Sequence, residues 1–193
     1  MIDEKCQNLD DKALVALSID DSQYFYCLMK RYEQSLARYV GRFTYLPDDD
    51  VADVIQDSFI LAYQHLNDFE SDLKFSSWLY RIVHNQAINF IKKNRQSIKI
   101  DFEKDDEFVE WLVAETNIEK ETVSKHFNEY IKTVIDKLKP DYKEVLVLRF
   151  YEDKDYSEIS DILQKPMGTV ATLLTRAKIQ FKKIYEKENK YFR

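Results

Sequence analysis

Apolar residues recur at intervals of three and four along most of the chain, a spacing that places them on one side of an α-helix. The first run of this kind covers residues 22–43, and Pro47 follows it. The second covers 48–66 and the third 75–94, with a polar connector at 67–74 between them. The pattern therefore predicts three amphipathic helices in the first half of the chain.

The pattern changes in the second half. Residues 97–120 show no clean period, and we expect them to form a linker between two domains at 1–96 and 121–193. Shorter helical runs follow in the second domain, at 121–139, 141–150, 157–163 and 169–184. The sequence thus predicts an all-α fold of two small helical domains joined by a linker.

Polar residues at the predicted helix starts are the expected N-caps, because their side-chain oxygens can accept hydrogen bonds from free backbone N–H groups. The expected capping residues are Asp48 or Asp49, Asp141, Ser157 and Thr169. Pro140 is expected to end the helix before it, since proline has no N–H to donate.

Composition excludes several classes of protein. The chain has 193 residues; 45% are hydrophobic, enough to bury a core, and two are glycine, too few for glycine-rich phosphate loops. No stretch approaches the ~18 uncharged apolar residues of a membrane span, and the acidic start is unlike a secretory signal, so we expect no membrane insertion. Cys6 and Cys27 form no CxxC motif, and we expect reduced thiols in the cytoplasm.

Charge is unevenly distributed along the chain. The net charge is −6, but residues 74–100 contain six basic and no acidic residues. Residues 101–121 contain nine acidic and two basic residues, which makes the predicted linker acidic, and residues 170–193 contain seven basic and two acidic. Two basic islands separated by an acidic bridge favour contact with nucleic acid, although charge runs are also common on solvated faces.

The last two predicted helices have the features of a helix-turn-helix. A short helix is followed by a tight turn at 164–168 and by a second helix that opens with Thr-Val. The first residues of such a second helix enter the major groove of DNA. We expect the outward face of this helix to carry Ala171, Thr172, Thr175 and Arg176. The face toward the domain should carry Leu173, Leu174 and Ala177, and a basic edge should carry Lys178, Lys182 and Lys183. The pattern alone leaves an ordinary helical hairpin open.

The predicted helix 75–94 combines aromatic, basic and amide side chains. These residues are Trp78, Tyr80, Phe90, Arg81, Lys92, Lys93, Asn85, Gln86 and Asn89. Aromatic rings stack on unpaired bases and amides read their edges, so this helix suits recognition of unstacked nucleic acid. Trp78 fits the core and a DNA contact equally well.

Two segments resemble one family, the extracytoplasmic-function (ECF) sigma factors, which are small two-domain specificity subunits of bacterial RNA polymerase. Residues 53–93 (DVIQDSFILAYQHLNDFESDLKFSSWLYRIVHNQAINFIKK) resemble the polymerase-binding and promoter-melting helices of the family. Residues 138–178 (LKPDYKEVLVLRFYEDKDYSEISDILQKPMGTVATLLTRAK) resemble its promoter-reading helix-turn-helix. The resemblance covers residues 8–188.

The resemblance implies roles for individual residues. Those implied to bind core RNA polymerase are Asp53, Gln56, Asp57 and Tyr63. Those implied to recognise and open the minus-ten promoter region are Lys74, Trp78, Arg81, Asn85, Asn89, Lys92 and Lys93. Those implied to contact the minus-thirty-five region are Arg149, Thr169, Ala171, Thr172, Thr175, Arg176 and Lys178. The connector 67–74 matches the loop that holds an extruded base, and the acidic linker matches the segment in the RNA exit path.

Several positions depart from the family pattern. Residues 171–173 read Ala-Thr-Leu where members often carry Arg-Ser-Arg, so the second helix has two fewer cations. Gln164 stands where a helix-ending glycine is common. A left-handed conformation costs a non-glycine residue about 1 kcal/mol, so we expect a differently shaped turn. Ser160 replaces a common alanine, a small-for-small change.

The implied function is that of an alternative sigma factor, which binds core RNA polymerase and directs promoter recognition, DNA melting and transcription initiation. Such a protein acts by binding, so we expect no catalytic residues, no metal site and no cofactor, and a cytoplasmic location. Because the chain is acidic overall, we expect it to bind promoter DNA weakly unless core polymerase holds it in place. An anti-sigma factor is the expected regulator.

Two other functions remain open on the residues alone. Asp49, Asp50 and Asp53 spell D-D-x-x-D, which in all-helical prenyl-transferring enzymes holds magnesium and a diphosphate, but no second acidic cluster faces them. A plain helix-turn-helix regulator that works without polymerase would explain the C-terminal half and leave residues 53–93 unexplained.

Overall fold

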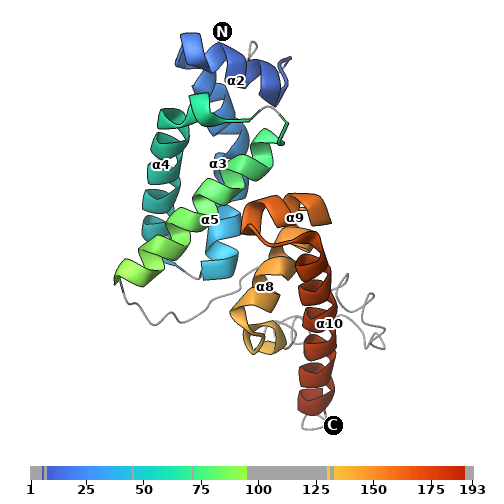
Figure 1. The fold of residues 1–193 in the computed structure, drawn as a ribbon. Coiled ribbons are helices and arrows are strands. Elements are labelled where there is room, and N and C mark those ends of the chain that lie inside the picture. Colours follow the sequence, from blue (N-terminus) through green and yellow to red (C-terminus); the bar gives the residue numbers. More distant parts are fainter. Residues whose placement is uncertain are drawn as a thin grey trace. The chain divides into compact units, whose positions relative to one another are not determined.

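The computed structural model describes residues 6, 8–44, 46–70, 72–94, 130 and 133–189, with side chains to residue 187 (Figure 1). These residues form helices and no strand, which confirms the predicted all-α class. The chain divides into two compact units, one built on Met1–Ile98 and one on Lys99–Ser160 with Lys165–Arg193. The predicted linker at 97–120 lies outside the described residues, so the linker and the domain bounds stay predictions.

The N-terminal unit is a bundle of helices centred on its longest member. In chain order it contains α2 (Asp11–Asp20), α3 (Gln23–Thr44), α4 (Asp48–Gln64), the 3-10 turn η1 (Leu66–Asp68) and α5 (Phe75–Asn94). Helix α3 packs against α2, α4 and α5 (Figure 1). The bounds of α3, α4 and α5 confirm the predicted helices to within two residues, whereas α2 was not predicted.

Apolar side chains at the predicted helical spacing fill the core of this unit. Those with no exposed surface include Leu14, Leu28, Leu36, Tyr39, Val40, Leu79 and Val83. Aromatic contacts join the helices: the ring centroids of Phe25 and Phe59 are 6.3 Å apart, and those of Tyr39 and Tyr80 are 5.2 Å apart. Each such pair adds about 0.5–1.5 kcal/mol to what burial contributes.

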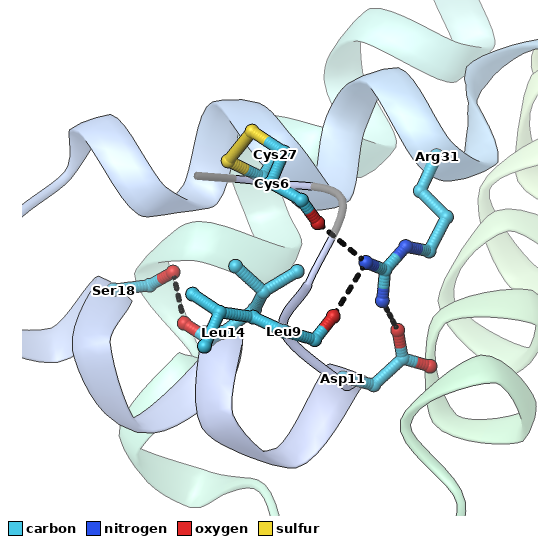
Figure 2. Close-up of a disulfide and its surroundings, with 7 residues drawn as sticks. All are labelled: Cys6, Leu9, Asp11, Leu14, Ser18, Cys27 and Arg31. Atoms are coloured by element: carbon cyan, nitrogen blue, oxygen red, sulfur yellow. Dashed lines mark hydrogen bonds and ion pairs between the residues drawn. A yellow bond between two sulfur atoms is a disulfide. The ribbon is translucent and has the colours of Figure 1, made fainter. Parts of the chain in front are cut away.

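A disulfide joins the start of the chain to α3, which corrects the expectation of two reduced thiols. Cys6 and Cys27 are bonded with their Cα atoms 5.3 Å apart, although 21 positions separate them in the sequence (Figure 2). The cysteines meet because α2 folds back against α3. Asp10 caps α2 by accepting a hydrogen bond from the backbone N–H of Ala13 at 2.8 Å, which fixes where this helix begins.

The C-terminal unit contains a helical segment at 133–136 followed by α8 (Pro140–Leu146), the π-helical turn η2 (Val147–Tyr151), α9 (Tyr156–Leu163) and α10 (Met167–Asn189). Helix α10 packs along α8 (Figure 1). Leu146, Leu148, Ile159, Val170, Leu174, Ala177 and Phe181 are buried in this unit. The hydroxyl of Tyr130 donates a hydrogen bond to the carbonyl of Tyr185 at 2.8 Å, which ties residue 130 to α10.

An ion pair lies in the interior of the same unit. The ammonium of Lys143 is 3.2 Å from a carboxylate oxygen of Asp136, and Lys143 is buried. Burial disfavours the charged forms of both groups, and this desolvation lowers the pKa of Lys143 to about 7 and raises the pKa of Asp136 to about 6. The stability of this unit therefore depends on pH.

The predicted N-caps are wrong at each helix start. Pro47 stands at the N-cap of α4 and Lys139 at that of α8, neither with a side-chain hydrogen bond. Pro140 is the first residue of α8, and the helical segment before it ends at Asp136, short of the expected Lys139. Asp155 caps α9 in place of Ser157: its side chain accepts from the N–H of Glu158, whose carboxylate accepts from the N–H of Asp155. The N–H groups of Thr169 and Val170 donate to the carbonyl of Pro166, so α10 begins before Thr169.

The turn between α9 and α10 keeps the left-handed geometry despite lacking glycine, which corrects the expected change of shape. Gln164 has a φ of 52°. The N–H of Lys165 donates to the carbonyl of Ser160 at 3.2 Å, and the side-chain amide of Gln164 donates to the carbonyl of Asp161 at 2.7 Å. These bonds satisfy carbonyls at the end of α9 and offset the backbone cost.

Candidate nucleic-acid interface

Helix α4 has one buried face and one exposed, mostly acidic face. Val51, Val54, Ile55, Ser58, Phe59 and Ala62 are buried, because they fall on the three-four spacing that faces α3 and α5. Asp53, Gln56 and Asp57 are exposed together on the opposite side. Tyr63 is exposed on the same side, and its ring lies 5.1 Å from that of Phe25, which holds it in place. The structure thus brings the four predicted polymerase-binding residues onto one face.

Helix α5 divides in the same way. Leu79, Tyr80, Val83 and Ala87 point into the unit, since each is almost fully buried. Asn85, Asn89, Lys92 and Lys93 are exposed, and Arg81 is half-buried on the same side. The predicted amide and basic residues therefore form one continuous outer face along the helix, which we call the α5 face: Arg81, Asn85, Asn89, Lys92 and Lys93. Lys74 is exposed just before the helix begins.

Trp78 is buried in the core of the free chain, which favours one of the two interpretations left open by the sequence; its contact with DNA stays a prediction. It is 6% exposed. Its ring centroid lies 5.4 Å from that of Phe69 and 5.6 Å from that of Phe75, so the first half of the connector and the start of α5 share one aromatic cluster. The free protein does not present Trp78 as a stacking platform, and Trp78 instead supports the connector.

His84 lies against α3 and not on the outer face of α5. Its ring stacks on Phe43 with centroids 5.5 Å apart, and its Nδ1 lies 3.2 Å from the hydroxyl of Tyr39. It is half-buried between α3 and α5. His84 therefore helps to join these helices.

The start of α10 presents hydroxyls and one cation. Thr169, Thr172, Thr175 and Arg176 are exposed, and Ala171 and Lys178 are half-buried. The hydroxyls of Thr172 and Thr175 donate to the carbonyls of Gly168 and Ala171, at 2.8 and 2.9 Å. Leu174 and Ala177 face the core as predicted, whereas Leu173 is only half-buried.

Arg149 lies in η2, apart from α10 in sequence, and is held by the loop that follows it. Its guanidinium donates to the carbonyl of Lys154 at 3.1 Å and lies 3.7 Å from a carboxylate oxygen of Asp153. Both Arg149 and Lys178 also approach the ring of Phe150, at 5.8 Å from its centroid. Phe150 thus brings a cation from η2 and a cation from α10 to the same place.

Sequence reasoning missed two exposed apolar residues beside these faces. Ile60 is 50% exposed on α4, where it stands between Asp57 and Tyr63 on the exposed face. Met167 is 56% exposed at the first position of α10. A signal was available for Ile60, because it stands three residues from both Asp57 and Tyr63 and so shares their side of a helix.

The described residues do not support the magnesium interpretation of D-D-x-x-D. Among them, no group of three or more histidine, cysteine, aspartate or glutamate side chains is arranged to hold a metal ion. Asp49 and Asp50 lie in the first turn of α4, where carboxylates interact favourably with the helix dipole. No helix in the described part of the chain is long and apolar enough to cross a membrane.

Comparison with known sequences identifies both halves of the chain. Residues 28–97 match the family described as Sigma-70 region 2, and residues 128–181 match Sigma-70, region 4. The chain is 33% identical over 178 residues to the ECF RNA polymerase sigma-E factor of Salmonella typhimurium, covering 89% of this chain and 92% of that protein. The ECF RNA polymerase sigma-E factor of Escherichia coli is 32% identical over the same coverage.

Comparison with solved structures shows the same fold. The structure of CnrH in complex with the cytosolic domain of CnrY has a TM-score of 0.67 and 22% identity, covering 92% of this chain and 97% of that one. The sigma factor RpoE from Bartonella quintana, in complex with the anti-sigma factor NepR, has a TM-score of 0.58 and 17% identity. The match covers 84% of this chain and 96% of that one. The chain belongs to the ECF RNA polymerase sigma factors, and it is an alternative sigma factor that directs promoter-specific transcription initiation by RNA polymerase.

Proposed function

We propose a division of labour among three surfaces. The exposed face of α4 binds core RNA polymerase through Asp53, Gln56, Asp57 and Tyr63. The α5 face, with Lys74 and the connector 67–74, recognises and opens the minus-ten region. The start of α10, with Arg149, contacts the minus-thirty-five region. Each surface joins residues that the resemblance implied, and each is exposed in the free protein.

The arrangement of α5 is the single observation that carries this proposal. One side of the helix is fixed in the core by Leu79, Tyr80 and Val83. The other side presents two amides one turn apart, Asn85 and Asn89, next to cations. Amides can hydrogen-bond to the edge of an unpaired base while cations hold its flanking phosphates, so this face suits one strand of opened DNA.

The physical effect of the α5 face is to stabilise DNA that is already opening. Unstacking bases costs a few kcal/mol per step. Capture of an unstacked base recovers about 1–3 kcal/mol. Because Trp78 is buried with Phe69 and Phe75, the aromatic cluster acts in this proposal by shaping the connector beside the captured base.

The proposal is tested by separating polymerase binding from DNA opening. Holoenzyme is assembled from core polymerase and either the wild-type chain or Asn85→Ala, and unpaired thymines in promoter DNA are detected with permanganate. We expect Asn85→Ala to bind core normally and to open the promoter about ten-fold less. Gln34→Ala, which removes an exposed amide from α3, is the matched control and should open DNA normally. An Asn85→Ala chain that fails to bind core, or that opens DNA as the wild type does, contradicts the assignment.

Ile60 extends the proposed polymerase surface. Its exposed side chain lies between the carboxylate of Asp57 and the ring of Tyr63, so it supplies apolar area at the centre of a polar face. We expect Ile60→Glu to weaken association with core polymerase more than Leu17→Glu, because Leu17 is an exposed apolar residue on α2, outside this face. Equal affinities of the two variants would contradict the role of Ile60.

The chain contributes binding and no bond-making step under this proposal, and polymerase carries out the chemistry in the cytoplasm. An anti-sigma factor is the proposed regulator, since the solved structures of CnrH and RpoE each hold such a partner or its cytosolic domain. Tyr26, Ile60 and Tyr63 are exposed on α3 and α4 and offer apolar surface to it. A partner that covers these residues would compete with core polymerase, which a competition binding assay can measure.

A further inference from the structure

The Cys6–Cys27 disulfide lies where the start of the chain crosses α3. Cys27 is buried in α3, whereas Cys6 is half-buried in the segment that precedes α2. Arg31, one turn along α3 from Cys27, donates to the carbonyls of Cys6 at 3.1 Å and Leu9 at 2.7 Å (Figure 2). Its other terminal nitrogen is 2.5 Å from a carboxylate oxygen of Asp11. One covalent bond and one guanidinium therefore hold this segment against α3.

A chain of contacts leads from this segment to the start of α5. The hydroxyl of Tyr32 donates to the second carboxylate oxygen of Asp11. The ring centroid of Tyr32 lies 6.0 Å from that of Phe75, and Phe75 packs on Trp78. Helix α2 itself packs against η1 and α5. The position of α2 is thus coupled to the aromatic cluster that supports the connector.

Without the disulfide, α2 stays attached through its buried Leu14 and Val15, whereas the polar contacts of the segment before it are weak. The side chains of Arg31 and Asp11 are 31% and 27% exposed, and ion pairs that water can reach contribute little. The bond closes a loop over a sequence separation of 21 residues, so breaking it returns conformational freedom to the whole segment. The ordering of the segment before α2, and of the first turn of α2, therefore depends on the oxidation state of two sulfur atoms.

We propose that Cys6 and Cys27 form a redox-sensitive clasp that fixes α2 against α3 and α5 when oxidised and loosens it when reduced. The oxidant is a low-molecular-weight disulfide. One cysteine thiolate attacks it and forms a mixed disulfide with release of one small thiol; the second thiolate then displaces the other small thiol and forms the protein disulfide. Two electrons pass to the oxidant, and the two protons from the cysteines leave with the small thiols. A cytoplasm rich in small thiols reverses both steps, with first attack at the less buried Cys6.

Hydrogen exchange of the full chain tests the clasp directly. The protein is prepared after treatment with excess glutathione disulfide or with dithiothreitol, and thiols are counted by alkylation. We expect no free thiol in the oxidised sample, and at least ten-fold faster exchange in residues 11–20 of the reduced sample. Cys6→Ser should exchange like the reduced wild type under both treatments. Unchanged exchange in 11–20, or two free thiols after oxidation, overturns the proposal.

The effect on promoter opening rests on the function proposed above and is measured separately. Oxidised chain, freed of glutathione, and Cys6→Ser are each assembled with core polymerase. We expect equal binding to core and several-fold less opening by Cys6→Ser, because the aromatic cluster beside the connector is less ordered. Equal opening would overturn the coupling of the clasp to α5. Failure of both chains to bind core would contradict the proposed function and leave the hydrogen-exchange result standing.

Discussion

Helices α5 and α10 carry the two proposed DNA-binding faces, and these faces are chemically different. The α5 face has two exposed amides, Asn85 and Asn89, with Arg81 before them and Lys92 and Lys93 after them. The start of α10 presents threonine hydroxyls and Arg176, and its further cations come later, at Lys178, Lys182 and Lys183. Amides and cations make directional contacts of about 1–3 kcal/mol with bases, whereas the hydroxyls of Thr172 and Thr175 already donate to their own helix. Promoter selectivity should therefore depend more on the N-terminal unit.

The interiors of the two units differ as well. Among the residues that the structure describes, the buried polar ones of the N-terminal unit are Ser18, Thr44, Ser58 and Ser77, and the first three donate to backbone carbonyls of their own helices. Those of the C-terminal unit are Lys143, Glu144 and Glu158, all ionisable. A hydroxyl keeps its protonation state across the physiological range, whereas a buried ammonium does not. On these described residues, the C-terminal unit should respond more strongly to pH than the N-terminal unit.

The largest effect is expected from removing both amides of the α5 face. Asn85→Ala with Asn89→Ala should lower the rate of promoter opening by about 100-fold, since each amide contact with a base is worth about 1–3 kcal/mol. Stopped-flow fluorescence with labelled promoter DNA and holoenzyme measures this rate. Thr172→Ala with Thr175→Ala on α10 is the comparison and should change it less than ten-fold. Equal losses would remove the contrast between the two faces.

The next effect is on stability against pH. Because the pKa of Lys143 falls to about 7 in the folded chain, the unfolded chain binds more protons above that pH, so stability rises as pH increases from 7 to 9. The expected gain is about 1–2 kcal/mol. Asp136, whose pKa is raised to about 6, contributes stability that is present at low pH and is lost as pH rises toward 6.

Urea unfolding followed by NMR signals of each unit measures this pH response. The signals of the C-terminal unit should shift to higher urea concentration between pH 7 and pH 9, while those of the N-terminal unit stay constant. Lys143→Met is the control, because it removes the buried ammonium. The C-terminal unit of this variant should be equally stable at pH 7 and pH 9. A shift that persists in Lys143→Met would show that another group is responsible.

A smaller effect is expected at the one cation on the outer start of α10. Arg176→Ala should weaken holoenzyme binding to the minus-thirty-five region by about ten-fold and relax discrimination at one base position. Competition among promoter fragments that vary in that region measures both quantities. If discrimination is unchanged, Arg176 contacts phosphate and the exposed threonines carry the readout.

The smallest effect is on salt dependence. Replacing a lysine that contacts a phosphate lowers the slope of log affinity against log salt by about 0.9 on duplex DNA and about 0.7 on a single strand. Lys182→Gln on α10 should lower the slope by about 0.9, the value for duplex DNA, and Lys92→Gln on α5 should lower it by about 0.7, the value for a single strand. Filter binding of holoenzyme across a salt series measures the slopes. A slope unchanged by Lys92→Gln would mean that this end of α5 faces solvent in the complex.

The sequence predicted long amphipathic elements well and features that depend on three-dimensional neighbours poorly. Helix α5 was predicted at its observed bounds, because apolar residues repeat over 20 positions between a polar connector and basic residues. Helix α2 was not predicted: it is ten residues long and buries only Leu14, Val15 and Ser18, too few to show a period. The disulfide could not be predicted, because it needs α2 to fold back on α3.

The candidate site shows the same limit. The resemblance named residues of α4 and α5 that, Trp78 apart, share one side of each helix, as helical spacing requires; their roles stay predictions. The place of Trp78 depends on Phe69, which comes from the connector, and no periodicity reports that contact. The N-cap of α9 was missed because two neighbouring polar residues, Asp155 and Ser157, both precede the helical run, and only Asp155 pairs with Glu158.

Transcription from genomic DNA tests the central claim most directly. The purified chain is added to core RNA polymerase, and the 5′ ends of single-round transcripts are mapped. We predict transcripts that begin at a limited set of sites, share sequence at minus ten and minus thirty-five, and are absent with core alone. Transcripts identical to those of core alone, from a chain that does not bind core, would contradict the account.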